Sequence, residues 1–300
     1  MMNNHVLFTV YDNSFDHLRQ LLVLLKLMSS STSHTAIIKV TAGKQVAAED
    51  ILAAEEPLEI RLNYGPANAR IQKSISVTMR TPGNDTELAV GFLYTEGIIH
   101  NFDQVNGAFV IPDNIVQVVL KEEVDLDLSK MERNFYTTSS CGVCGKSSID
   151  AVKTACNIFP DDNTLQYSST TLAQLPEKLK QHQQLFASTG GIHASAIFDT
   201  IGNLVLSRED VGRHNALDKL IGASLEKGLL PLNNYLLLLS GRASFELIQK
   251  AAMAGIKLVA AVGAPSSLAV QTAKEFNMTL IGFLRDDRFN IYCGDQRLQL

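Results

Sequence analysis

The chain has 300 residues, of which 46% are hydrophobic, and a formal net charge of -5. This is enough apolar material for a large core without disulfides or metals. The weakly acidic balance argues against nucleic acid or a membrane surface as partner. With 4 cysteines and no tryptophan, the chain lacks the dense cysteine spacing of secreted scaffolds, so we expect it in the cytoplasm.

The first 35 residues are predicted to be a flexible N-terminal extension, because their composition differs from that of the rest of the chain. The apolar run at 21–25 is flanked by Arg19 and Lys26 and is too short to span a bilayer. Met28 is a second candidate start, so the sequence leaves open whether the residues before it are translated.

Residues 36–135 are predicted to form a β-rich N-terminal region. Apolar and polar residues alternate over 58–62, 75–79 and 116–128, the period-two pattern of half-buried strands. One helix is expected over 86–99, after a Pro-Gly-Asn turn that provides a break.

Residues 136–300 are predicted to form an α/β domain. Its first half is expected to contain helices at 147–156, 172–186 and 211–227 and strands at 193–198 and 204–206. Its second half is expected to contain strands at 235–239, 257–262 and 278–284, with helices that reach residues 254 and 276. Strands and helices that alternate in this way favour a parallel sheet with right-handed crossovers.

Three loops of the second half come directly after strands and are rich in small or basic residues, at 240–244, 263–267 and 285–288. In such a sheet, ligands bind beyond the carboxyl ends of the strands. Free N–H groups at a helix start favour anions, and Arg242, which lies in the first loop, can add charge-assisted hydrogen bonds. Glycine and serine are also common at ordinary turns, so the pattern indicates a phosphate or nucleotide site without proving one.

Cys141 and Cys144 form a CxxC pair bracketed by glycines. Such a pair can exchange disulfides, share a metal or carry sulfur as a persulfide, and all three uses need a thiolate. A structural zinc needs four ligands, and no second CxxC is present, so no metal site is predicted. A glycine after Cys144 suits an exposed loop better than the helix start of a thioredoxin-type motif.

The segment 207–219 is densely polar and enters a helix. One interpretation is a solvated helix start in which Asp218 pairs with Arg213 or His214. The segment also offers suitable donors for a phosphorylated or pterin-like ligand, namely Arg208, Arg213, His214 and Asn215. His193, at a strand start, is a weaker candidate, because a lone histidine there is commonly a satisfied polar residue.

Five segments of the sequence closely resemble the FdhD family of formate dehydrogenase accessory sulfurtransferases. They are CGVCG at 141–145, TGGIHASA at 189–196, SREDVGRHNALDKLIG at 207–222, LLSGRASFELIQKAAMAGI at 238–256 and GFLRDDRFNIY at 282–292. The resemblance runs from about residue 46 to the C-terminus.

The resemblance implies a cytidine deaminase-like α/β/α core and a homodimer. It implies that Cys141 receives persulfide sulfur from a cysteine desulfurase, with Cys144 as a possible assisting thiol. The sulfur then passes to the molybdenum cofactor, in its bis(molybdopterin guanine dinucleotide) form, for formate dehydrogenase. Deamination itself is not expected, because no His-x-Glu motif precedes the CxxC and Ser195 lies two residues after His193.

The resemblance also implies a cofactor-binding segment, which comprises Phe283, Leu284, Arg285, Asp286, Asp287 and Arg288. The loop and helix-start pattern adds weaker candidates, namely Ser240, Gly241, Arg242, His193, Arg213 and His214. Two alternative functions stay open: an escort that binds the cofactor without using the cysteines, and a thiol-disulfide oxidoreductase.

Overall fold

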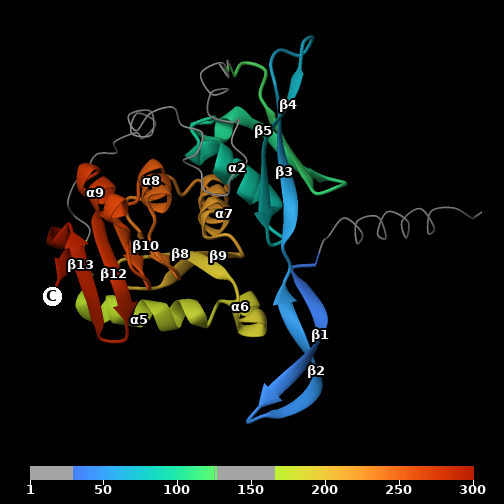
Figure 1. Ribbon diagram of the computed structural model, residues 1–300. Coiled ribbons are helices and arrows are strands. Elements are labelled where there is room, and N and C mark those ends of the chain that lie inside the picture. The colour runs from blue at the N-terminus through green and yellow to red at the C-terminus, as the bar shows by residue number, and fades with distance from the viewer. Residues whose placement is uncertain (1–29, 125, 127–165) are drawn as a thin grey trace, which may run out of the picture.

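The computed structural model describes residues 30–124, 126 and 166–300. Its centre is a six-stranded sheet with the order β13-β12-β11-β10-β8-β9 (Figure 1). The strands are β8 (His193–Phe198), β9 (Leu204–Asp210), β10 (Leu236–Leu239), β11 (Leu258–Ala261), β12 (Thr279–Arg285) and β13 (Arg288–Cys293). Strands β10, β11 and β12 are parallel, as predicted, but β8, β9 and β13 pair antiparallel with their neighbours, so the sheet is mixed.

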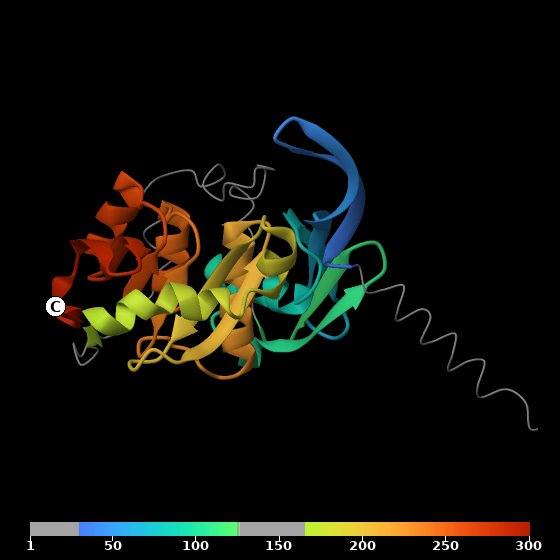
Figure 2. The same cartoon turned by 90° about the horizontal axis from the view of Figure 1, so that it is seen from below.

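Helices cover both faces of this sheet, which confirms the predicted α/β class. Helix α5 (Ser169–Lys180) lies along one face, as Figure 2 shows. Helices α7 (Arg213–Glu226), α8 (Phe245–Met253) and α9 (Ser267–Glu275) lie on the other. The short strand β7 (Tyr167–Ser168) precedes α5 and pairs with β14 (Leu298–Gln299). The single turn η2 (Asp295–Arg297) leads into β14.

The predicted helix at 172–186 is two helices. Helix α5 ends at Lys180 and α6 (Gln184–Thr189) begins after a short break. The carboxylate of Glu209 on β9 accepts hydrogen bonds from the N–H groups of Leu185 and Phe186, both at 3.0 Å. A carboxylate at a helix start satisfies N–H groups that have no partner within the helix, so β9 fixes where α6 begins.

A second sheet has four strands in the order β4-β3-β6-β5. They are β3 (Glu56–Tyr64), β4 (Ile71–Arg80), β5 (Val105–Ile111) and β6 (Ile115–Leu120), with the turn η1 (Phe102–Gln104) before β5. The alternation over 58–62 is confirmed, since Leu58, Ile60 and Leu62 are fully buried. The alternation over 75–79 predicts three buried side chains, and only that of Ile75 is buried. The register between β3 and β4 shifts by one residue next to Ile60, and Val77 and Met79 face solvent.

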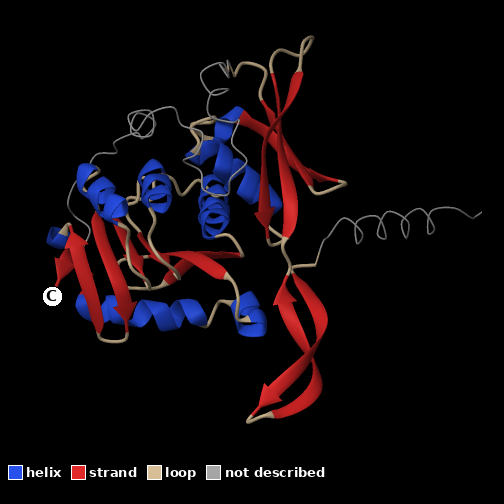
Figure 3. Cartoon of the chain, viewed as in Figure 1, coloured by secondary structure: helices blue, strands red, loops and turns tan. Residues whose placement is uncertain are grey.

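Helices α2 (Asp85–Thr95) and α7 pack together between the two sheets (Figure 3). Their contact depends on Gly91 and Gly222: a Cβ atom on either would lie 1.9 Å from a backbone oxygen of the other helix. One hydrophobic cluster includes Leu58 of β3 and Leu237 of β10. The predicted N-terminal and α/β regions therefore share a core.

A two-stranded hairpin, β1 (Thr32–Thr41) and β2 (Lys44–Ala53), extends away from the body in Figure 1. Because β1 begins at Thr32, the boundary predicted at residue 36 falls inside this strand. The strand predicted over 116–128 ends at Leu120. The predicted helix at 147–156 lies outside the described residues.

Candidate functional site

The CxxC pair, Cys141 and Cys144, lies outside the described residues. In the described part, Cys293 on β13 is half-buried and its thiol donates to the carbonyl of Met278 at 3.3 Å. Burial raises the pKa of Cys293, which disfavours its thiolate. The candidate site that the structure describes is therefore the predicted ligand-binding edge of the sheet.

The loops after β10, β11 and β12 meet at one edge, which we call the carboxyl edge. Backbone hydrogen bonds join the first loop to the second and the second to β12: Gly263 donates to Gly241 at 3.0 Å, and Phe283, within β12, donates to Gly263 at 3.1 Å. The antiparallel pairing of β8 with β10 brings the start of β8 to the same edge. The first two predicted loops thus lie side by side, and the third begins two residues after Phe283 on β12.

His193 starts β8 and lies directly against the loop at 240–244. The hydroxyl of Ser240 accepts from the N–H of Ala194 at 2.8 Å, and a Cβ on Gly241 would lie 3.1 Å from Nδ1 of His193. Burial lowers the pKa of His193, and the nearby charge of Arg213 lowers it further. The imidazole is therefore held neutral at neutral pH, with one donor and one acceptor nitrogen.

Arg213 and His214 open α7 beside this loop. Nε2 of His214 lies 3.2 Å from the hydroxyl of Ser244 and 3.6 Å from the carboxylate of Glu246. The Nε atom of Arg213 is buried and has no hydrogen-bond partner among the described residues. The interpretation in which Asp218 pairs with Arg213 or His214 is wrong, because Asp218 binds an ammonium group on α8, 2.9 Å away. Arg213 is thus left as a buried donor at the carboxyl edge.

The predicted cofactor segment forms the hairpin between β12 and β13. Arg285, Asp286, Asp287 and Arg288 are exposed around its turn, whereas Leu284 is fully buried in the core under α5. A hollow of about 420 Å³ is lined by five residues of the hairpin, Phe283, Arg285, Arg288, Phe289 and Asn290. The structure brings both arginines to one hollow and buries Leu284 completely, outside the lining of that hollow.

A larger cavity, of about 510 Å³, opens between His193 and the helices α5 and α6. Apolar side chains that include Leu179, Phe186 and Ile192 line it, with Gln183 and Ser240 among its polar groups. Sequence reasoning missed Gln183 and Phe186, because a single helix at 172–186 gives neither residue a special place. The only available signal was the polar stretch at 181–183, where the helix breaks.

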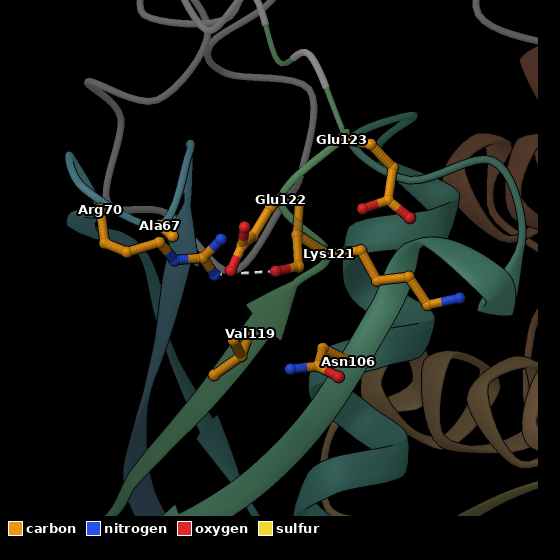
Figure 4. Close-up of a pocket in the computed structure, with 8 residues that line it drawn as sticks. Ala67, Arg70, Asn106, Val119, Lys121, Glu122 and Glu123 are labelled. Carbon is orange, nitrogen blue, oxygen red and sulfur yellow. Dashed lines mark hydrogen bonds between the residues drawn. The ribbon is translucent and has the colours of Figure 1, made fainter.

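A further hollow, of about 410 Å³, lies beside Arg70 at one end of the second sheet (Figure 4). The guanidinium of Arg70 is already occupied, since it donates to Asn63, Gly65 and the carbonyl of Leu120 at 2.6 to 2.9 Å. These bonds tie β6 to the turn between β3 and β4. The hollow is therefore better explained as part of the scaffold than as a ligand site.

Within residues 30–124 and 166–300, no group of three or more His, Cys, Asp and Glu side chains is arranged to hold a metal ion. None of the helices in these ranges combines the length and the apolar character needed to cross a bilayer.

Comparisons with known proteins show the family. The FdhD/NarQ family matches residues 53–299. A protein of Streptomyces avermitilis named sulfur carrier protein FdhD is 48% identical over 283 residues, which cover 91% of this chain and 98% of that protein. The protein of the same name from Sulfurisphaera tokodaii is 41% identical and covers 87% of this chain and 97% of its own length.

A solved structure shares the fold. A chain from Desulfotalea psychrophila, described as a formate dehydrogenase accessory protein, superposes with a TM-score of 0.70 over 89% of this chain and 99% of that chain, at 22% sequence identity. At that identity the likeness concerns the arrangement of helices and strands.

Proposed function

The chain belongs to the FdhD/NarQ family, and on that premise we propose that it is a persulfide-carrying sulfurtransferase required for formate dehydrogenase activity. Cys141 accepts sulfur from a cysteine desulfurase, and the acceptor substrate is the molybdenum cofactor in its bis(molybdopterin guanine dinucleotide) form. Relatives that are 41 to 48% identical carry the name sulfur carrier protein, which supports the transfer of sulfur.

One observation supports a phosphorylated acceptor: the carboxyl edge gathers cationic and donor groups that have little to bind within the protein. Arg213 keeps a buried Nε without a partner in the described part of the chain. Arg285 and Arg288 line a hollow at the same edge. Guanidinium groups bind phosphate through charge-assisted, often bidentate hydrogen bonds, and the acceptor carries pyrophosphate groups.

The proposed loading step is a thiolate exchange. The Cys141 thiolate attacks the terminal sulfur of the donor persulfide, the donor sulfur–sulfur bond breaks, and the donor leaves as a thiolate. Cys141 then carries the new sulfur–sulfur bond. Cys144 assists release when its thiolate attacks the Cys141 sulfur, which frees the terminal sulfur and leaves a disulfide that a cellular thiol must reduce.

The proposal includes the setting in which the protein works. We place it in the cytoplasm, where thiols stay reduced, with the desulfurase and formate dehydrogenase as partners. We also propose a homodimer, on the family resemblance. Sedimentation equilibrium of the full chain tests this: a mass of twice 32.8 kDa is expected, and a monomer at every accessible concentration would contradict it.

Intact-protein mass spectrometry after incubation with a cysteine desulfurase and cysteine tests the sulfur carrier. We expect a gain of one sulfur atom that a reductant removes, and no gain in Cys141→Ser. Cys293→Ser is the matched control, since its thiol is half-buried and outside the motif, and it should load as the wild type does. No gain in the wild type, with an active desulfurase, would favour the cofactor-binding escort.

A further inference from the structure

The hairpin of β1 and β2 carries large apolar side chains that the structure leaves in solvent. We call this hairpin, residues 32–53, the arm, and in Figure 1 it extends away from the body. Four of its apolar residues are 46 to 68% exposed, namely Ile38, Val40, Val46 and Leu52. An isolated two-stranded hairpin is only marginally stable in water, and exposed apolar surface of this kind commonly marks an interaction site. The arm is therefore a candidate docking surface.

No further strand pairs with the arm in the part of the chain that the structure describes. Strands β1 and β2 form a two-stranded sheet of their own and pair along their whole length. Helix α6 contacts β2, but Asp50 and Leu52 stay exposed. The edge of a strand presents N–H and C=O groups without partners, and such edges commonly pair with another chain. The arm thus offers both backbone groups and apolar side chains to a partner.

Charges of opposite sign lie toward the two ends of β2 on one face of the arm. Alternate residues of a strand share a face, so Lys44 and Asp50 lie on the same face, three residues before and three residues after Ala47. The one ion pair described within the arm joins His34 to Glu49, which belong to the other face. The face with Lys44 and Asp50 therefore has an exposed positive position near the tip and an exposed negative position near the body.

We propose that the arms of two copies of this chain lie antiparallel about a two-fold axis near Ala47, with Lys44 of each copy beside Asp50 of the other. A two-fold axis makes every contact occur twice, so the surface must be complementary to itself. The arm meets this condition, because reversing its direction places the positive position of one copy against the negative position of the other. The same arrangement brings the exposed Val46 of both copies close to the axis, which removes apolar surface from water. The inference rests on the proposed homodimer and adds to it a contact surface.

Charge reversal and its rescue, measured by sedimentation equilibrium of the full chain, test this contact. Lys44→Glu makes both positions negative and Asp50→Lys makes both positive, so we expect either variant alone to raise the dissociation constant of the dimer at least about tenfold. An equimolar mixture of the two variants should restore a dimer of nearly wild-type affinity, because opposite charges meet again in the mixed dimer. Lys227→Glu is the matched control: Lys227 is exposed at the end of α7, outside the arm, and this variant should dimerise like the wild type.

Sulfur loading of Cys141, measured on the same variants by mass spectrometry, separates this contact from the proposed sulfur transfer, and both variants should load as the wild type does. A dimer that persists unchanged in both single variants would overturn the contact between arms and leave the homodimer and sulfur carriage intact. So would single variants that weaken the dimer without rescue in the mixture, because the two charges would then not meet across the axis. A wild type that is monomeric at every accessible concentration would overturn the contact together with the homodimer, even if Cys141 loads with sulfur.

Discussion

Arg213 and His214 are neighbours at the start of α7, yet their side chains have different surroundings. His214 contacts the hydroxyl of Ser244 and the carboxylate of Glu246, so its role in the free protein is structural. Arg213 has a buried Nε without a partner in the described residues. Burying a polar group without a hydrogen-bond partner costs free energy. The position of Arg213 is therefore better explained by ligand binding than by a contribution to stability.

Arg213→Met should therefore weaken anion binding without unfolding the protein. We expect affinity for inorganic pyrophosphate to fall about tenfold or more, since a charge-assisted hydrogen bond contributes about 1.5–3 kcal/mol. The free energy of unfolding should change by no more than about 0.5 kcal/mol. Arg61→Met removes the same charge from a partly buried ion pair with Glu59 and should leave binding intact. Equal losses in both variants would contradict a specific role.

The contact between Glu246 and His214 affects the free energy of unfolding at acidic pH. The hydrogen bond from His214 lowers the pKa of Glu246 from 4.5 to about 2. Because the folded state holds this pKa below its unfolded value, the contribution is complete above pH 4.5 and is lost as the pH falls toward 2. Between pH 4.5 and 2, the free energy of unfolding measured in urea should fall less for Glu246→Gln than for the wild type. Glu177→Gln is the control, because Glu177 forms an exposed ion pair, and it should follow the wild type.

A buried lysine joins three helices. Lys250 on α8 binds both oxygens of Asp218 on α7 at 2.9 Å, and it also contacts the hydroxyl of Thr95 on α2 at 2.8 Å. Burial raises the pKa of Asp218, against the attraction of Lys250. The pair therefore fixes how the helices meet more than it adds net stability.

Lys250→Met should be strongly destabilising, because it leaves the Asp218 carboxylate buried without its cation. A cost of about 3–5 kcal/mol is expected from broken buried pairs. The double variant Asp218→Leu/Lys250→Met should recover a large part of that loss, since the buried Asp218 carboxylate is removed together with its cation. Glu96, 3.7 Å from the ammonium group of Lys250, loses this ion pair in both variants. Chemical denaturation of the single and double variants measures this, and a double variant as unstable as the sum of both singles would show that the ions do not act as a pair.

The crossing of α2 and α7 should be equally sensitive to size. Gly222→Ala would place a methyl group 1.9 Å from the carbonyl oxygen of Glu87, so the helices must separate. We expect a loss of about 1–3 kcal/mol, typical of overpacking. Gly191→Ala, whose Cβ would meet only Thr189 at 3.9 Å, is the control and should keep nearly the wild-type unfolding midpoint.

Local patterns in the sequence were enough to predict most elements but not their orientation. The apolar run at 235–239 and the glycine-bounded helices predicted strands and crossovers correctly, because burial and capping are local. The antiparallel direction of β8 depends on pairing across the sheet, which periodicity does not encode, and β13 was not predicted as a strand. The helix break before Gln184 is set by Glu209, more than twenty residues later, so the cavity at Gln183 could not be predicted.

For the molecule as a whole, sulfur loading and ligand binding require different groups. In the proposed function, loading needs a thiolate at Cys141, whereas ligand binding at the carboxyl edge needs arginine and histidine side chains. The chain carries a net charge of -5, so the proposed anion site at the edge would have to attract its ligand locally, against the field of the whole protein.

This separation gives a prediction for the full chain. Cys141→Ser should lose sulfur loading in mass spectrometry and still bind GDP with nearly the wild-type affinity in calorimetry. GDP binding should weaken as salt rises, because ions screen the contacts between phosphates and partly exposed arginines. A Cys141→Ser protein that loses GDP binding as well would instead place the thiol at the ligand, and the two steps would then have to be described as one site.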